Sequence, residues 1–156
     1  MDGFAGPAVL VGVDGTAGSV RALRWAAEEA RQRSARLRVV LAWEPAHLAT
    51  YSSVASHADR SQQKQSAEAV LVTALEAVFG SRLPHNVIAE VIEGVPARVL
   101  VKESGAADLL VLGSAPTASP SGSSVGPVTR VCLKQALCPV MIIGPRQPAA
   151  TLLTAL

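Results

Sequence analysis

Asp14 and the loop that begins at Gly113 are the two places where residue types and spacing suit ligand chemistry. Asp14 follows the apolar run 8–13. A carboxylate at the end of a buried strand can accept a hydrogen bond from a ribose hydroxyl or help to hold a metal ion. The alternative is an Asp-Gly turn that only connects a strand to the next helix. The loop 113–126 precedes a helical pattern, and the unpaired N–H groups at a helix N-terminus suit phosphate.

Several other chemistries are excluded by their motifs. The chain has no G-x-G-x-x-G after its first apolar run and no G-x-x-x-x-G-K-[ST]. Residues 122–126 match the G-x-S-x-G elbow of hydrolases, but no Asp, Glu or His follows Gly126 to complete a triad. The histidines are too widely spaced for a helical metal-binding pair, so no metal site is predicted: they are His47, His57 and His85.

The elements that must position these residues are short apolar runs alternating with helical patterns. The expected strands cover 8–13, 37–43, 87–92, 108–112 and 138–143. The expected helices cover 19–33, 60–79, 97–104 and 127–136, with an aperiodic connection over 44–59. Strict alternation predicts an α/β fold with a doubly wound five-stranded parallel sheet and four helices. Ligands of such sheets lie beyond the carboxyl ends of the strands, so Asp14 and Gly113 lie side by side if the first and fourth strands are neighbours.

Composition places the chain among single-domain proteins. Its 156 residues are 49% hydrophobic but only 3% aromatic, and the net charge is +2. So small a charge gives no long-range attraction to nucleic acid or membrane, and the arginines at 21, 24, 31, 33, 36 and 38 are interpreted as a solvated helix face. No apolar run approaches the roughly 20 residues of a membrane span. Cys132 and Cys138, on an expected helix and strand, fit a reducing compartment, and the absence of a targeting pattern predicts a cytoplasmic protein.

An ordered set of short segments resembles the universal stress protein family: 11–16, 22–26, 94–97, 108–114, 126–129 and 138–140. The resemblance implies an adenine nucleotide α-hydrolase-like fold with strand order 3-2-1-4-5. It also implies a domain over 1–144, a tail over 145–156, and a homodimer formed through strand 139–143. Many members of the family bind ATP.

The family's ATP motif is altered in this chain. Gly113 and Gly126 match its first and third glycines, but Pro116 replaces the middle glycine and Pro127 replaces the following Ser. Each proline removes a backbone N–H, and the loop 114–125 contains no Lys or Arg. We therefore expect ATP or another adenine nucleotide to bind weakly.

By resemblance, Asp14 and the main chains of Val13 and Trp43 hold the nucleoside. The remaining nucleotide-binding residues are Gly113, Ser114, Gly126, Val128 and Thr129. One hypothesis is a stress-response protein with a weak regulatory nucleotide site. The other is a dimeric interaction module that binds no nucleotide. Slow ATPase activity is not expected, because the loop offers no Lys to meet the developing phosphate charge.

Overall fold

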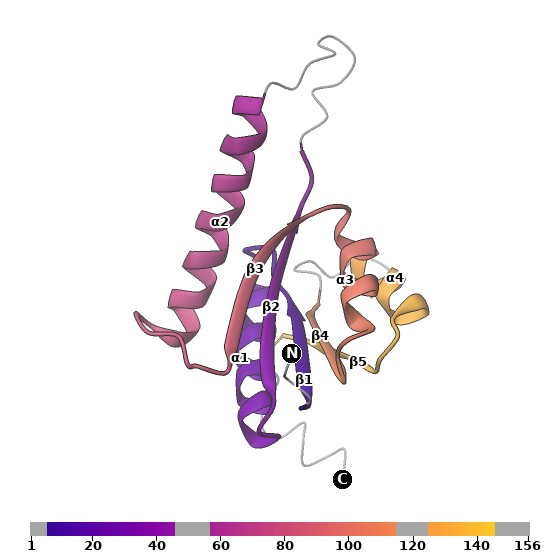
Figure 1. Ribbon diagram of the computed structural model, residues 1–156. Coiled ribbons are helices and arrows are strands. Elements are labelled where there is room, and N and C mark those ends of the chain that lie inside the picture. The colour runs from indigo at the N-terminus through magenta and orange to yellow at the C-terminus, as the bar shows by residue number, and fades with distance from the viewer. Residues whose placement is uncertain (1–5, 46–56, 115–124, 146–156) are drawn as a thin grey trace.

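Five parallel strands and four helices alternate in the part of the chain that the structure describes, as the sequence predicts (Figure 1). The computed structural model describes residues 6–45, 57–114 and 125–145. The elements are β1 (Ala8–Gly12), α1 (Ala17–Gln32), β2 (Arg36–Trp43), α2 (His57–Phe79), β3 (Val87–Glu93), α3 (Pro96–Ser104), β4 (Leu109–Gly113), α4 (Pro127–Gln135) and β5 (Val140–Ile143). They form one sheet in the order β3-β2-β1-β4-β5, which confirms the expected topology.

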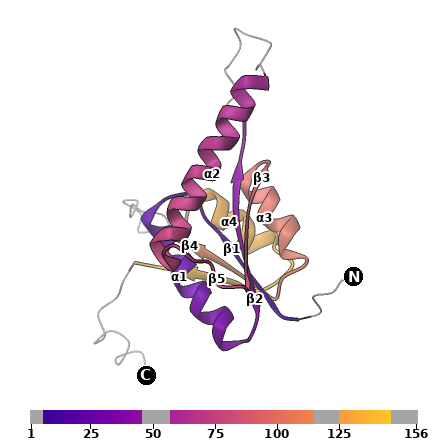
Figure 2. The same cartoon turned by 60° about the vertical axis from the view of Figure 1, so that its left-hand side comes forward.

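The sheet lies between two helical layers. Helices α1 and α2 cover one face and helices α3 and α4 cover the other (Figures 1 and 2). Alternate residues of the central strands therefore enter different cores: Val9, Val11 and Val111 pack beneath α1 and α2, whereas Leu10, Leu110 and Leu112 pack beneath α3 and α4. Because both of their faces are buried, β1 and β4 are apolar at every position.

Strands β1 and β4 are adjacent and parallel at the centre of the sheet, which confirms another prediction. Leu10 lies opposite Leu110, and both are fully buried. At the beginning of the two strands, Asp108 makes two hydrogen bonds to Ala8. The Ala8 N–H donates to the side-chain oxygen Asp108 Oδ2 at 2.8 Å, and the Asp108 N–H donates to the Ala8 carbonyl at 2.8 Å. Asp108 thus fixes the register of two strands that are 100 residues apart in sequence.

One helix and one strand begin at other residues than predicted, because a helix cap decides the first case and a proline the second. Helix α1 begins at Ala17, two residues before its predicted start, because Thr16 is its N-cap and its hydroxyl accepts from the Ser19 N–H. Strand β5 begins at Val140 and not at Cys138, because Pro139 has no N–H to donate. Cys138 therefore lies in the turn before the strand, while Cys132 is buried in α4.

The interpretation of the arginine-rich segment is wrong for Arg36 and Arg38, which belong to β2 and not to a helix face. The Arg38 guanidinium donates to Glu90 of β3 at 2.5 Å and to Glu103 of α3 at 2.8 Å. Burial opposes its charge, but the two carboxylates outweigh that effect and raise the pKa of Arg38. This ion pair ties α3 to the sheet.

Some predictions fall outside the described residues, namely those on His47, Pro116 and the tail leucines 152, 153 and 156. Among the helices that the structure describes, none combines the length and the apolar character needed to cross a membrane.

Candidate functional site

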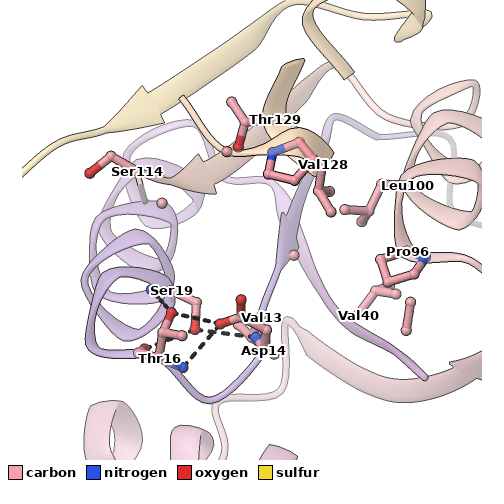
Figure 3. A pocket seen from close by; sticks show the side chains of 15 residues that line it. Val13, Asp14, Thr16, Ser19, Val40, Pro96, Leu100, Ser114, Val128 and Thr129 are labelled. Carbon is pink, nitrogen blue, oxygen red and sulfur yellow. Dashed lines mark hydrogen bonds between the residues drawn. The ribbon is translucent and has the colours of Figure 1, made fainter. Parts of the chain in front are cut away.

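A cavity of about 270 Å³ opens where β1 and β4 end (Figure 3). This size is near the lower end of the roughly 300–1,000 Å³ of small-molecule sites. Its lining comes from the ends of the central strands, the start of α1, α3 and the start of α4: Gly12, Val13, Asp14, Thr16, Ser19, Val40, Ala42, Pro96, Leu100, Gly113, Ser114, Gly126, Pro127, Val128 and Thr129. The position beyond the carboxyl ends of the strands is the one expected for this fold.

The polar wall of the cavity is the turn from Asp14 to Ser19. Asp14 Oδ1 accepts from the Thr16 hydroxyl at 2.6 Å and from the Thr16 N–H at 3.0 Å. The Asp14 N–H in turn donates to the Ser19 hydroxyl at 3.2 Å, and that hydroxyl donates to the Thr16 carbonyl at 3.0 Å. The turn therefore holds the carboxylate in one orientation before any ligand arrives.

These hydrogen bonds keep Asp14 ionised. Partial burial by itself disfavours the charged carboxylate, but the hydrogen bonds from Thr16 and the nearby Ser19 hydroxyl outweigh it, and the pKa of Asp14 lies below its ordinary value. The cavity thus presents a fixed negative charge at neutral pH.

The opposite side of the cavity combines an apolar surface with a helix N-terminus. Val40, Pro96 and Leu100 form the apolar part, which suits the face of a planar base (Figure 3). Helix α4 begins at Pro127 with Gly126 as its N-cap and no capping side chain. The N–H groups of the first turn have no partner inside a helix, and here they belong to Gly126, Val128 and Thr129. These donors and the helix dipole favour an anionic group.

Seven of the eight predicted site residues line this one cavity, and Trp43 does not. The Trp43 carbonyl accepts from the Gly94 N–H at 2.8 Å, and its side chain packs partly buried on the core beneath α1 and α2. Its β2 neighbours Val40 and Ala42 face the cavity instead. The ligand contacts assigned to the seven lining residues stay predictions.

Gly113 also has a purely structural reason to be glycine. A Cβ at this position would lie 2.6 Å from the Gly18 carbonyl carbon and 3.0 Å from the Ser19 nitrogen, so β4 and α1 meet backbone to backbone. The next residue, Ser114, donates its N–H to the Ile143 carbonyl at 3.0 Å, which joins the loop to β5. Its hydroxyl is buried, and no residue in the described part of the chain gives it a hydrogen-bond partner.

Sequence reasoning did not identify Thr16, Ser19, Pro96 or Leu100 as site residues. A Thr directly before a helical pattern is an N-cap signal, and it could have placed Thr16 at the start of α1, two residues after Asp14. Nothing in the sequence distinguishes Leu100 from an ordinary core residue. Within the described ranges no group of three or more His, Cys, Asp or Glu residues is arranged to hold a metal ion.

Comparison with known proteins identifies the family to which the chain belongs. The family model described as "Universal stress protein family" matches residues 7–144. The chain belongs to the universal stress protein family.

Individual relatives agree with this membership. The universal stress protein Rv3134c of Mycobacterium tuberculosis is 34% identical over 146 residues, which are 92% of this chain and 52% of the relative. The chain thus spans about half the length of this relative.

Two solved structures of the universal stress protein family are each 25% identical with a TM-score of 0.56. One is a complex with cAMP, in which the match covers 90% of this chain and 98% of that chain. The other is a protein from Arabidopsis thaliana with AMP bound, covering 92% and 96% respectively.

Proposed function

We propose that this universal stress protein binds an adenine nucleotide weakly, as a regulatory ligand and not as a turnover substrate. The supporting observation is one cavity that places a fixed carboxylate, Asp14, across from an apolar surface and the N-terminus of α4. A nucleoside fits the first two features and a phosphate fits the third. The cAMP and AMP complexes of its relatives support the choice of an adenine nucleotide.

The end of the site that would bind phosphate offers few hydrogen-bond donors and no cation from the described residues. Pro127 occupies the first helical position and supplies neither an N–H nor a hydroxyl. No Lys or Arg is among the described residues that line the cavity, and the sequence from 114 to 125 contains none. A hydrogen bond to a charged group contributes about 1.5–3 kcal/mol, so the loss of two weakens binding by roughly two to four orders of magnitude.

We therefore expect ATP, AMP and adenosine to bind with similar dissociation constants near millimolar. The double variant Pro116→Gly/Pro127→Ser restores both missing donors, and it is expected to increase ATP affinity at least tenfold while changing AMP affinity less. Titrations followed by two-dimensional NMR measure constants in this range. Pro84→Ser, a proline change in the turn before β3 and away from the cavity, is the matched control.

Two results would contradict this proposal. Tight ATP binding by the unmodified protein would show that the prolines do not impair the phosphate end. No binding of any adenine compound at millimolar concentration would favour the alternative function, an interaction module of the same fold acting in the cytoplasm.

We also propose that the protein forms a homodimer through β5. Within the described residues this strand pairs only with β4, so its outer edge is open. It carries no charge, and Met141 is 41% exposed. Proteins usually protect such edges with charges or bulges, and pairing with a second copy satisfies the backbone groups instead.

A single charge at this edge is expected to separate the protomers. Met141→Lys desolvates a charge in the interface, so sedimentation at micromolar concentration is expected to give a dimer for the wild type and a monomer for the variant. Val72→Lys changes an exposed apolar residue on α2, 51% exposed against 41% for Met141, and is expected to leave the dimer intact. A wild-type monomer under these conditions rules the dimer out.

A further inference from the structure

Helices α3 and α4 carry four exposed cations on the side that faces away from the sheet. Leu100 of α3 and Cys132 of α4 are buried in the core beneath these helices. A residue two positions away along a helix lies about 200° around the axis, which is the opposite side. The residues two positions before and after each buried side chain are exposed cations: Arg98 and Lys102 on α3, Arg130 and Lys134 on α4.

The two helices place these pairs next to each other. They lie side by side (Figures 1 and 2), and both begin at the cavity, which Pro96 and Pro127 line. After α4 ends, the Leu137 N–H donates to the Ser104 hydroxyl of α3 at 2.9 Å. Packed helices are about 8–10 Å apart, and residues four apart on one helix are separated by about 5–6 Å. The four cations therefore form a compact array of two rows, which we call the basic face.

The basic face has no free carboxylate on its own helices. Glu103, the acidic residue of α3, is paired with Arg38 of β2, and α4 contains no acidic residue. None of the salt bridges between described residues includes a cation of the basic face. Like charges four residues apart on a helix repel each other, so an anionic partner relieves an unfavourable interaction within each row.

Leu137 adds an apolar contact at one end of the basic face. It is 72% exposed, more than any other large apolar residue that the structure describes. A Cβ at Gly105 would lie 3.2 Å from Leu137 Cδ1, so the leucine covers the C-cap of α3. Gly105 follows Lys102 by three positions and thus lies on the same side of α3. A partner of this surface therefore combines negative charge with an apolar group.

We propose that the basic face binds an acidic amphipathic helix of a partner protein, which lies along α3 and α4 with its carboxylates over the cations and an apolar side chain against Leu137. Glutamates four residues apart on such a helix have the same spacing as the cations of each row. This inference goes beyond nucleotide binding and does not depend on it.

The other large anions fit this surface less well. Single-stranded nucleic acid is bound through aromatic side chains on which bases stack, and α3 and α4 contain no aromatic residue. Helices that lie on membranes bury a whole apolar face in the lipid. The apolar faces of α3 and α4 are already packed on the sheet.

The test uses a synthetic helical peptide of about 20 residues, with glutamates four residues apart and leucines beside them. Fluorescence anisotropy with the full chain at about 50 mM salt is expected to show saturable binding, with a dissociation constant on the order of 100 μM. A peptide with glutamine in place of every glutamate is expected to bind about tenfold more weakly or worse.

Two double variants each remove one row of the basic face. They are expected to weaken binding of the glutamate peptide about fivefold or more: Arg98→Gln/Lys102→Gln and Arg130→Gln/Lys134→Gln. The matched control is Lys64→Gln/Arg82→Gln, which removes the same net charge from exposed positions on α2 and the segment after it. It is expected to change the affinity less than about twofold. All six side chains are exposed, so the variants are expected to fold.

The apolar contact is tested separately. Leu137→Ser is expected to weaken binding about threefold or more at every salt concentration, because the contact is not electrostatic. Leu83→Ser changes another exposed leucine, 45% exposed and located between α2 and β3, and is expected to have no effect.

Three results would overturn the inference. The first is the absence of saturable binding of the glutamate peptide. The second is an equal loss of affinity in the control and in both row variants, because net charge alone would then explain the binding. The third is tighter binding of a DNA duplex or of phosphatidylserine vesicles than of the peptide at the same salt concentration, which would assign the basic face to nucleic acid or to membrane.

Discussion

Gly113→Ala is expected to destabilise the protein by about 3 kcal/mol or more, a large part of the roughly 5–15 kcal/mol of a typical domain. The new methyl group would meet the backbone of Gly18 and Ser19, not a flexible side chain that could turn away. To make room, α1 must move away from β4, which disturbs the core beneath α1 and α2. Urea denaturation measures the loss.

Gly144→Ala is the matched control, because none of the residues that the structure describes comes within 4 Å of a Cβ at that position and the backbone angle is not in the left-handed region. It is expected to leave the stability unchanged. If Gly113→Ala were equally harmless, the contact between β4 and α1 would not be tight. The glycine would then be explained by ligand binding alone.

Arg38→Met is expected to cost about 2–3 kcal/mol, because it leaves two carboxylates facing each other without a cation. The side chains of Arg38 and Glu103 are only 16% and 22% exposed, so water compensates poorly. Glu90 is 41% exposed, and for this reason the cost stays below that of a fully buried pair. Adding Glu90→Gln and Glu103→Gln to Arg38→Met is expected to recover part of the loss.

The comparison for this prediction is Arg31→Met, which removes an arginine from an exposed pair with Glu28 on α1. Solvent screens that pair, so no measurable change is expected. Equal effects of the two substitutions would refute a structural role for the Arg38 ion pair. Melting temperature and urea midpoint give two separate measures of the difference.

The fold could be predicted because the alternation of apolar strands and amphipathic helices is repeated along the whole domain, so that no single residue decides it. Strands β1 and β4 are apolar at nearly every position, and each is followed by a helix with its own apolar stripe. The predictions were wrong where one polar side chain decides where a helix begins or which residues form an ion pair. The Thr16 hydroxyl starts α1 early, and Arg38, which resembles its solvated neighbours in sequence, finds carboxylates on β3 and α3. Partners 52 and 65 residues away cannot be inferred from local composition.

The candidate site was predictable on its glycine-rich side and at Asp14. These residues carry motifs, and the topology brings them together. The apolar surface was not predictable, because Val40, Pro96 and Leu100 are ordinary members of a strand and a helix until the fold turns them toward one space. Trp43 does not line the cavity, because its side chain packs on the core beneath α1 and α2 and its carbonyl accepts from the Gly94 N–H. The nucleoside contact assigned to its main chain stays a prediction.

The pairing of Ala8 with Asp108 also has a consequence for synthesis. The ribosome delivers β1 first, but its partner β4 follows about a hundred residues later, at the usual rate of roughly 5–20 residues per second. During those seconds β1, β2 and β3 can pair with one another. The edge of β1 that will later pair with β4 stays without a partner strand, and both faces of β1 carry apolar side chains. Such a nascent half-sheet is expected to be the species most prone to aggregate, and folding is expected to be slow for so small a domain.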